Sequence, residues 1–317
     1  MSKSYGIEYL RLIGFFAVVV IHANALDLFG DWRVTGYVSD QLSRFAVPGF
    51  FIISGYLWKR EEIAKPHAAS WKLASKIVPI FVAWIAIYMI AEFSDLYPRE
   101  FGVKIAAYLA VPFTGGPGFH LWFLSALVLG SALCWIAIDR FGEQTALISA
   151  CCLYASGVLI GTYGHLFGLR FPLFTYRNGI IEAPLLLMIG YLLQGSRFLH
   201  ANRLFFATMA LGGIVVQLSE GILSGRFPAT VEYSLGTVPF SVGLFGLFLS
   251  VNISDRGWGK AVLGAYLIHL FVLKVLAAHL VSTGPLPAFT VTIAAALMSL
   301  LIARLLLQSP ARKLVSA

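Results

Sequence analysis

The sequence predicts an all-α integral membrane protein, a bundle of about ten transmembrane helices. Hydrophobic residues make up 59% of its 317 residues and charged residues only 12%, whereas a soluble domain carries roughly 25% charged residues. The mean hydropathy of +0.82 agrees with this composition. A water-soluble fold of this size would have too little polar surface, but lipid solvates apolar side chains directly. We therefore expect a single transmembrane domain that covers residues 1–317.

Ten apolar runs mark the expected spans, because crossing a bilayer takes about 20 mostly apolar residues. The second and sixth runs are short, and the tightest turn is expected around residues 139–142. Residues 101–113 are apolar but contain a proline near their end, and we interpret them as an interfacial or re-entrant segment. The predicted spans are residues 6–26, 43–58, 77–94, 120–138, 144–165, 179–195, 204–220, 234–253, 261–280 and 287–308.

The distribution of lysine and arginine predicts that both termini are cytoplasmic. With the N-terminus inside, thirteen basic residues fall in inner loops and six in outer loops, which is the bias that the positive-inside rule describes. The net charge of +8 could indicate a nucleic-acid partner. The clustering of lysine and arginine in short loops between apolar runs argues against this interpretation. No small-residue cleavage site follows the first apolar run, so we expect this run to be retained as a span.

Arg11 and His22 are the most informative ionisable residues, because charged or titratable groups inside a span are costly and are candidates for function. They lie eleven residues apart in the first span, hence within roughly 20° on one helix face and about 16 Å apart in depth. Glu8, one turn before Arg11, can pair with it. The structural alternatives are an Arg11 that snorkels to lipid headgroups and a His22 that hydrogen-bonds a neighbouring helix. Their shared face favours a catalytic role for both.

The second and sixth spans contribute three further polar candidates, which we expect to bind substrate. Arg44 opens the second span and Ser54 lies deeper in it, although Ser54 could instead bond a carbonyl of its own helix. Glu182 lies near the outer end of the sixth span and is a candidate counter-ion for Arg44 or Arg177.

The fourth and ninth spans supply the remaining candidates for substrate binding. A Gly/Pro-rich stretch precedes His120 and Trp122, which suits a substrate-facing loop, with an interfacial aromatic anchor as the alternative. His269 lies in the middle of the ninth span, where a packing role is the alternative. The three cysteines lie within apolar runs without metal-ligand spacing, so no metal site is expected.

Five segments, in chain order, resemble the acyltransferase family 3 of membrane proteins. The similarity runs over nearly the whole chain and is greatest to the short form of the family, such as enterobacterial common antigen and exopolysaccharide O-acetyltransferases. The segments are EYLRLIGFFAVVVIHA (8–23), SRFAVPGFFIISGYL (43–57), FHLWFL (119–124), LLLMIGYLL (185–193) and LGAYLIHLFVLK (263–274).

This resemblance implies an enzyme of the bacterial inner membrane that moves an acyl group, usually acetyl from acetyl-CoA, to a hydroxyl of an envelope glycan. Acetyl-CoA is then a donor rather than a bound cofactor, and the other partners are a glycan or lipid-linked glycan and membrane lipids. Arg11 and His22 carry over as the essential pair. Many members have an Arg-x-x-Arg cluster after the second helix, where this chain has Lys72 and Lys76. These lysines are the expected contacts to coenzyme A, as point charges without the fork of arginine.

The hypothesis drawn from these residues places the donor phosphates at the inner basic loop and at Arg11. His22 takes the proton from the attacking sugar hydroxyl, and Ser54 or His120 donates to the oxyanion. A covalent intermediate on His22 or Ser54 stays open. The competing class is a transporter or flippase of an envelope lipid, although the inverted repeats typical of transporters are not evident. A non-catalytic membrane scaffold is the third interpretation.

Overall fold

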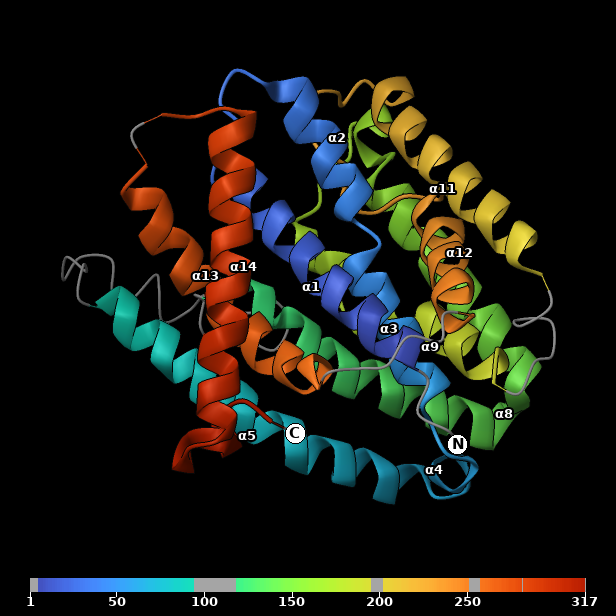
Figure 1. Ribbon diagram of the computed structural model, residues 1–317. Helices are drawn as coiled ribbons and strands as arrows, with labels where there is room; N and C mark the ends of the chain where they lie inside the picture. The colour runs from blue at the N-terminus through green and yellow to red at the C-terminus, as the bar shows by residue number, and fades with distance from the viewer. Residues whose placement is uncertain (1–4, 94–117, 195–201, 251–256, 281, 317) are drawn as a thin grey trace.

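The computed structural model describes residues 5–93, 118–194, 202–250, 257–280 and 282–316, and every regular element in these ranges is a helix (Figure 1). The predicted all-α membrane class is therefore confirmed. The predicted re-entrant segment, residues 101–113, lies outside the described residues.

Six described helices are long and apolar enough to cross a membrane, and shorter helices complete the bundle. Several begin with proline in the first turn, as α5, α9 and α14 do, where the missing N–H has no helical acceptor to lose. The long helices are α1 (Tyr5–Ala25), α5 (Pro66–Phe93), α8 (Trp122–Gly161), α11 (Arg203–Leu223), α13 (Val262–Ala278) and α14 (Pro285–Leu307). The shorter ones are α2 (Arg33–Ser43), α3 (Ala46–Tyr56), α4 (Arg60–Ala64), α9 (Ala183–Leu192) and α12 (Thr237–Leu249).

The α8 segment contains the predicted fourth and fifth spans as two arms. The break falls at Gly142, which has a left-handed φ of 82°, a conformation open to glycine because it has no Cβ. Both arms return to the same end of the molecule. Trp122, at the start of the first arm, lies beneath Arg177, and Thr162, at the end of the second, donates to the Tyr233 carbonyl next to Glu232.

The expected outer loop around Arg33 is instead the helix α2. This helix buries one face, which includes Tyr37, Asp40 and Gln41, and leaves Val34 and Leu42 exposed. It packs against α1 and α11. Its length of 11 residues is too short for a span, which explains why a search for apolar runs missed it.

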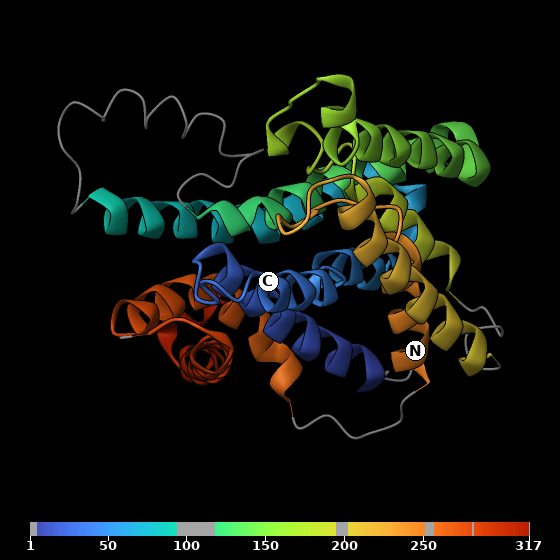
Figure 2. The same cartoon turned by 90° about the horizontal axis from the view of Figure 1, so that it is seen from above.

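The helix α1 occupies the middle of the bundle, where it contacts α2, α3, α12, α13 and α14. Figure 2 shows α13 and α14 on one side of α1 and α8 and α11 on the other. The two ends of the chain lie on the same side of the molecule, at the bottom of Figure 1. An even number of crossings predicts this arrangement.

The closest helix approach in the bundle joins α3 to α9 through two glycines. A Cβ at Gly55 would collide with the carbonyl of Leu187, and a Cβ at Gly190 would collide with the carbonyl of Ile52. Small residues let membrane helices pack backbone to backbone. The contact fixes α3, which follows Arg44, against α9, which follows Glu182.

We predict that Gly190→Ala lowers the thermal unfolding midpoint of the purified protein, because the added methyl group forces α9 away from α3. Overpacking of this kind typically costs about 1–3 kcal/mol. Gly212→Ala is the matched control, since nothing lies within 4 Å of a Cβ at that helical position, and alanine favours helix. Equal midpoints for the two variants would show that the interlock contributes nothing.

Candidate functional site

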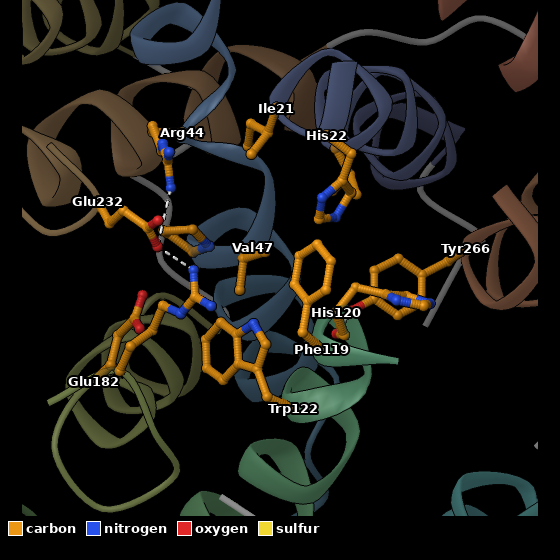
Figure 3. Close-up of a pocket in the computed structure, with 13 residues that line it drawn as sticks. Ile21, His22, Arg44, Val47, Phe119, His120, Trp122, Glu182, Glu232 and Tyr266 are labelled. Carbon is orange, nitrogen blue, oxygen red and sulfur yellow. Dashed lines mark hydrogen bonds and ion pairs between the residues drawn. The ribbon is translucent and has the colours of Figure 1, made fainter. Parts of the chain in front are cut away.

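A pocket opens between the C-terminal end of α1, the start of α3 and the start of α8, and its empty space is about 550 Å³, which includes its open mouth (Figure 3). We call it the outer pocket, after the side on which the sequence predicts these helix ends. Loops before α9 and α12 close its other side. His22 and His120 lie on one side of this outer pocket, and Glu182 and Glu232 lie on the opposite side. The other polar or aromatic lining residues are Arg44, Phe119, Trp122, Arg177 and Tyr266.

Three buried histidines from three different helical segments meet at this pocket. The ring centroids of His22 and His120 are 6.0 Å apart, and His269 lies 5.1 Å from His22 and 5.0 Å from His120. Each ring keeps one buried nitrogen that has no partner among the residues that the structure describes: Nδ1 of His22, Nδ1 of His120 and Nε2 of His269. His269 is held by the Tyr266 carbonyl, and His120 lies 3.5 Å from the Tyr88 hydroxyl. A neutral imidazole with a free nitrogen can accept a proton.

An ion-pair network forms the opposite wall. Arg44 donates to both carboxylate oxygens of Asp40, at 2.6 Å and 3.0 Å, and lies 3.4 Å from Glu232. Arg177 pairs with the same Glu232 oxygen. Burial raises the pKa of Glu232, but the neighbouring Arg177 and Arg44 outweigh it and hold that pKa below its usual value. Glu232 is therefore an anion that binds two guanidinium groups.

Trp122 and Glu182 complete this wall. The guanidinium of Arg177 lies 4.9 Å from the Trp122 ring centroid, in a cation–π contact. Glu182 is only 4% exposed, and its Oε2 atom is buried without a hydrogen-bond partner. A buried carboxylate oxygen without a donor is costly in an empty protein, and it is suited to receive a hydrogen bond from a ligand.

A second, larger pocket of about 1480 Å³, open to solvent in part, lies toward the end of the bundle that holds the chain termini. Its walls are mainly apolar. Its polar lining consists of Arg11, Ser54, Lys260, Tyr266 and Ser316. Arg11 pairs with Glu8 at 2.9 Å, as the sequence predicted, and Ser54 donates to the Phe50 carbonyl at 2.7 Å. This inner pocket combines an apolar channel with a basic mouth.

Tyr266 lines both pockets and, together with neighbouring aromatic rings, separates them. Its hydroxyl donates to the His120 carbonyl, and its ring centroid lies 5.9 Å from that of Phe123. Phe123 in turn lies 5.8 Å from Phe50. We call Tyr266, Phe123 and Phe50 the aromatic partition. It joins α13 to α8 and α3 where the two pockets adjoin.

The chain matches the sequence profile of an acyltransferase domain, the acyltransferase 3 family, over residues 4–307. The chain belongs to the acyltransferase 3 family. It is also 26% identical over 212 residues to an amino-acid racemase of Enterococcus faecalis, covering 62% of this chain and 29% of the racemase. A serine/alanine racemase of Enterococcus gallinarum is 29% identical over 239 residues, covering 67% of this chain and 33% of that protein. The chain thus spans about a third of the length of these relatives, and no solved structure matches it.

The structure of this acyltransferase 3 chain gathers most of the residues that the sequence singled out. The outer pocket holds His22, Arg44, His120, Trp122 and Glu182, and His269 lies directly against its histidines. The candidates Arg11 and Ser54 line the inner pocket instead.

Lys72 and Lys76 lie in neither pocket of the acyltransferase 3 chain, and both are exposed on α5. The inner pocket is instead lined by Lys260, which lies in the 3-10 helix Trp258–Ala261. Among the described residues, no group of three or more histidine, cysteine, aspartate or glutamate side chains could hold a metal ion.

Sequence reasoning missed the acidic partners of the outer wall. It paired Glu182 with Arg44 or Arg177, whereas Asp40 and Glu232 make those ion pairs. Asp40 lies on the unpredicted helix α2, and Glu232 lies in a loop. The sequence did carry one signal for these partners. The predicted outer loops hold more arginines than there are acidic residues in the nearby spans, and buried guanidinium groups need counter-ions.

Proposed function

We propose that this chain is a membrane O-acyltransferase that moves an acetyl group from acetyl-CoA to a hydroxyl of a cell-envelope or exopolysaccharide glycan. The observation that carries the proposal is the pair of pockets that meet at the aromatic partition. One pocket has a basic mouth and an apolar channel, and the other has histidines facing a polar wall. Both termini and the inner pocket then face the cytoplasm of a bacterial inner membrane, where acetyl-CoA is made.

The inner pocket suits a coenzyme A thioester. This thioester is polyanionic at the coenzyme A phosphates, and the arm that carries the acyl group is long and weakly polar. Arg11 and the exposed Lys260 at the mouth attract phosphate groups. The arm extends between Phe50, Phe123 and Leu127 toward Tyr266, which brings the thioester to the partition. The apolar walls exclude water and protect the thioester from hydrolysis.

The outer pocket suits the acceptor hydroxyl and its general base. His22 presents a buried nitrogen that has no partner among the described residues, and a neutral imidazole can accept a proton through such a nitrogen. In the proposed reaction the hydroxyl oxygen forms a bond to the acetyl carbonyl carbon while its proton passes to His22. The carbon–sulfur bond then breaks, and the proton is returned to the departing thiolate. His120, adjacent to His22, is placed to donate to the oxyanion.

Ser54 is less suited to carry a covalent acetyl group. Its hydroxyl is already donated to the Phe50 carbonyl within the same helix, and no histidine bonds to it among the described residues. A serine nucleophile requires an adjacent base. We therefore favour direct transfer to the acceptor over an acyl-enzyme on Ser54.

A transporter of an envelope lipid-linked glycan is the second candidate function. Two pockets on opposite sides of a thin partition are also the arrangement that alternating access requires. Transport does not consume a thioester, so release of free coenzyme A in step with acceptor modification separates the two functions. The match covers only about a third of the Enterococcus racemases, and we do not carry their named activity to this chain.

His22→Gln is the most direct test of the proposed chemistry. Glutamine keeps a hydrogen-bonding group but cannot act as a base at neutral pH, so we expect acetyl transfer to fall by about 10²–10⁴-fold while acetyl-CoA binding is retained. His67→Gln is the control, because His67 is exposed on α5 and lines neither pocket. Transfer is measured as labelled acetyl on the glycan in membranes with matched protein levels. Near-normal transfer by His22→Gln would rule out the base and indicate a structural role.

Lys260→Gln tests the position of the donor. The inner pocket predicts that this variant raises the apparent KM for acetyl-CoA several-fold at low salt. The effect should shrink at high salt, because exposed charges are screened over about 8 Å at physiological ionic strength. The double variant of Lys72 and Lys76 to glutamine is the comparison. A KM that rises for the double variant but not for Lys260→Gln would move the phosphates to the loop that the sequence predicted.

A further inference from the structure

The charged side chains of the outer pocket are paired with one another in a way that disfavours an anionic ligand. Two guanidinium groups, Arg44 and Arg177, face three carboxyl groups, Asp40, Glu182 and Glu232. Arg44 binds Asp40 through two hydrogen bonds, and both arginines share Glu232. Glu182 has no arginine partner among the described residues. Among the described residues, both arginines are therefore paired with carboxylates of the protein, and Glu182 is the acidic residue that has no arginine partner.

An anion that approached Arg44 would compete with Asp40 and Glu232, which already bind this guanidinium. Asp40 is 1% exposed and the Arg44 side chain is 9% exposed, so a displaced Asp40 would remain buried and unpaired. Removing one partner from a buried ion pair is strongly unfavourable. The two histidines of the pocket lie against each other, and a second positive charge there would be repelled by the first. Within the part of the chain that the structure describes, both arginines of the pocket are thus already paired with carboxylates, which disfavours a ligand carboxylate or phosphate.

The pocket does offer the groups that bind an uncharged sugar. Glu182 directs a buried, unpartnered Oε2 toward the cavity, and an acceptor without a donor is satisfied by a ligand hydroxyl. The Trp122 side chain lies in the same wall (Figure 3), and its flat ring supplies an apolar surface. Glu182 and His22 lie on opposite sides of the pocket (Figure 3). A sugar that bonds to Glu182 through one hydroxyl therefore has its opposite side toward His22.

We propose that the acceptor unit bound in the outer pocket is an uncharged sugar ring, with one hydroxyl bonded to Glu182, and that the pocket rejects sugars bearing a carboxylate or phosphate. This inference rests on the proposed acyl transfer, because it describes the acceptor of that reaction. It makes Glu182 a specificity-determining residue, distinct from the base His22.

The test compares two probes that differ in one group, hexyl β-D-glucoside and hexyl β-D-glucuronide. Binding to the full chain in lipid nanodiscs is measured by saturation-transfer NMR titration, and transfer by acetylation of each probe from labelled acetyl-CoA. We expect the glucoside to bind at least about ten-fold more tightly, which corresponds to about 1.4 kcal/mol, because the glucuronide carboxylate would leave water for a buried pocket whose arginines are already paired. Equal or tighter binding of the glucuronide would overturn the proposal, as would the absence of binding by either probe.

Glu182→Gln locates the preference. The variant replaces one carboxyl oxygen with an NH2 group and retains the shape of the side chain, so glucoside binding should weaken about ten-fold and the preference over glucuronide should narrow. Glu143→Gln is the control, because Glu143 is exposed, bonds to Tyr191 and lines neither pocket. An unchanged preference in Glu182→Gln would overturn the role of Glu182. The comparison of the two probes on the unaltered chain needs no variant to fold.

The failure of the acyl transfer itself gives a different result. Selective, Glu182-dependent binding of the glucoside without any acetylation would support the pocket assignment and contradict the proposed function. Acetylation of the glucuronide in preference to the glucoside would support acyl transfer and contradict the acceptor class.

Discussion

The pairing of Arg44 and Arg177 with Asp40 and Glu232 is the interaction on which the outer half of the molecule depends. Ionisable groups near a membrane interior persist only when they face the bundle interior and find partners. These pairs join α2, the start of α3 and the loops before α9 and α12 around one carboxylate. They hold the wall that faces His22 and His120. Without them, the pocket would have no fixed shape against which a hydroxyl could be oriented.

The aromatic partition places a second constraint on the fold. In the proposed topology, with the two pockets on opposite sides of a membrane, this wall has to keep them separate, or water and ions would pass between them. Tyr266 meets this need with its ring against Phe123 and its hydroxyl on the His120 carbonyl. For the proposed transfer, the same wall also has to be thin enough for an acetyl group to reach the acceptor. The lining of both pockets by Tyr266 agrees with both requirements.

The sequence predicted the helices well where hydropathy decides the outcome. The break at Gly142 and the shortness of α3 and α9 could be read directly from the residues. The helix α2 could not, because its stability comes from packing one face on α1 and α11 rather than from an apolar run. Among the site residues, His22 and Glu182 could be singled out from the sequence, because ionisable groups within a span are energetically costly. Nothing in the sequence distinguishes Glu232 or Tyr266. Only the tertiary arrangement brings Glu232 into contact with two arginines and places Tyr266 in the lining of both pockets.

The central claim is that an acetyl group passes from an inner donor pocket to an outer acceptor pocket through the partition. Reconstituted vesicles test it most directly, with labelled acetyl-CoA outside and a neutral, membrane-impermeant oligosaccharide sealed inside. Protein inserted with its inner pocket outward should label the sealed oligosaccharide, although neither substrate crosses the bilayer. Acetylation that occurs only when donor and oligosaccharide are on the same side would contradict the account.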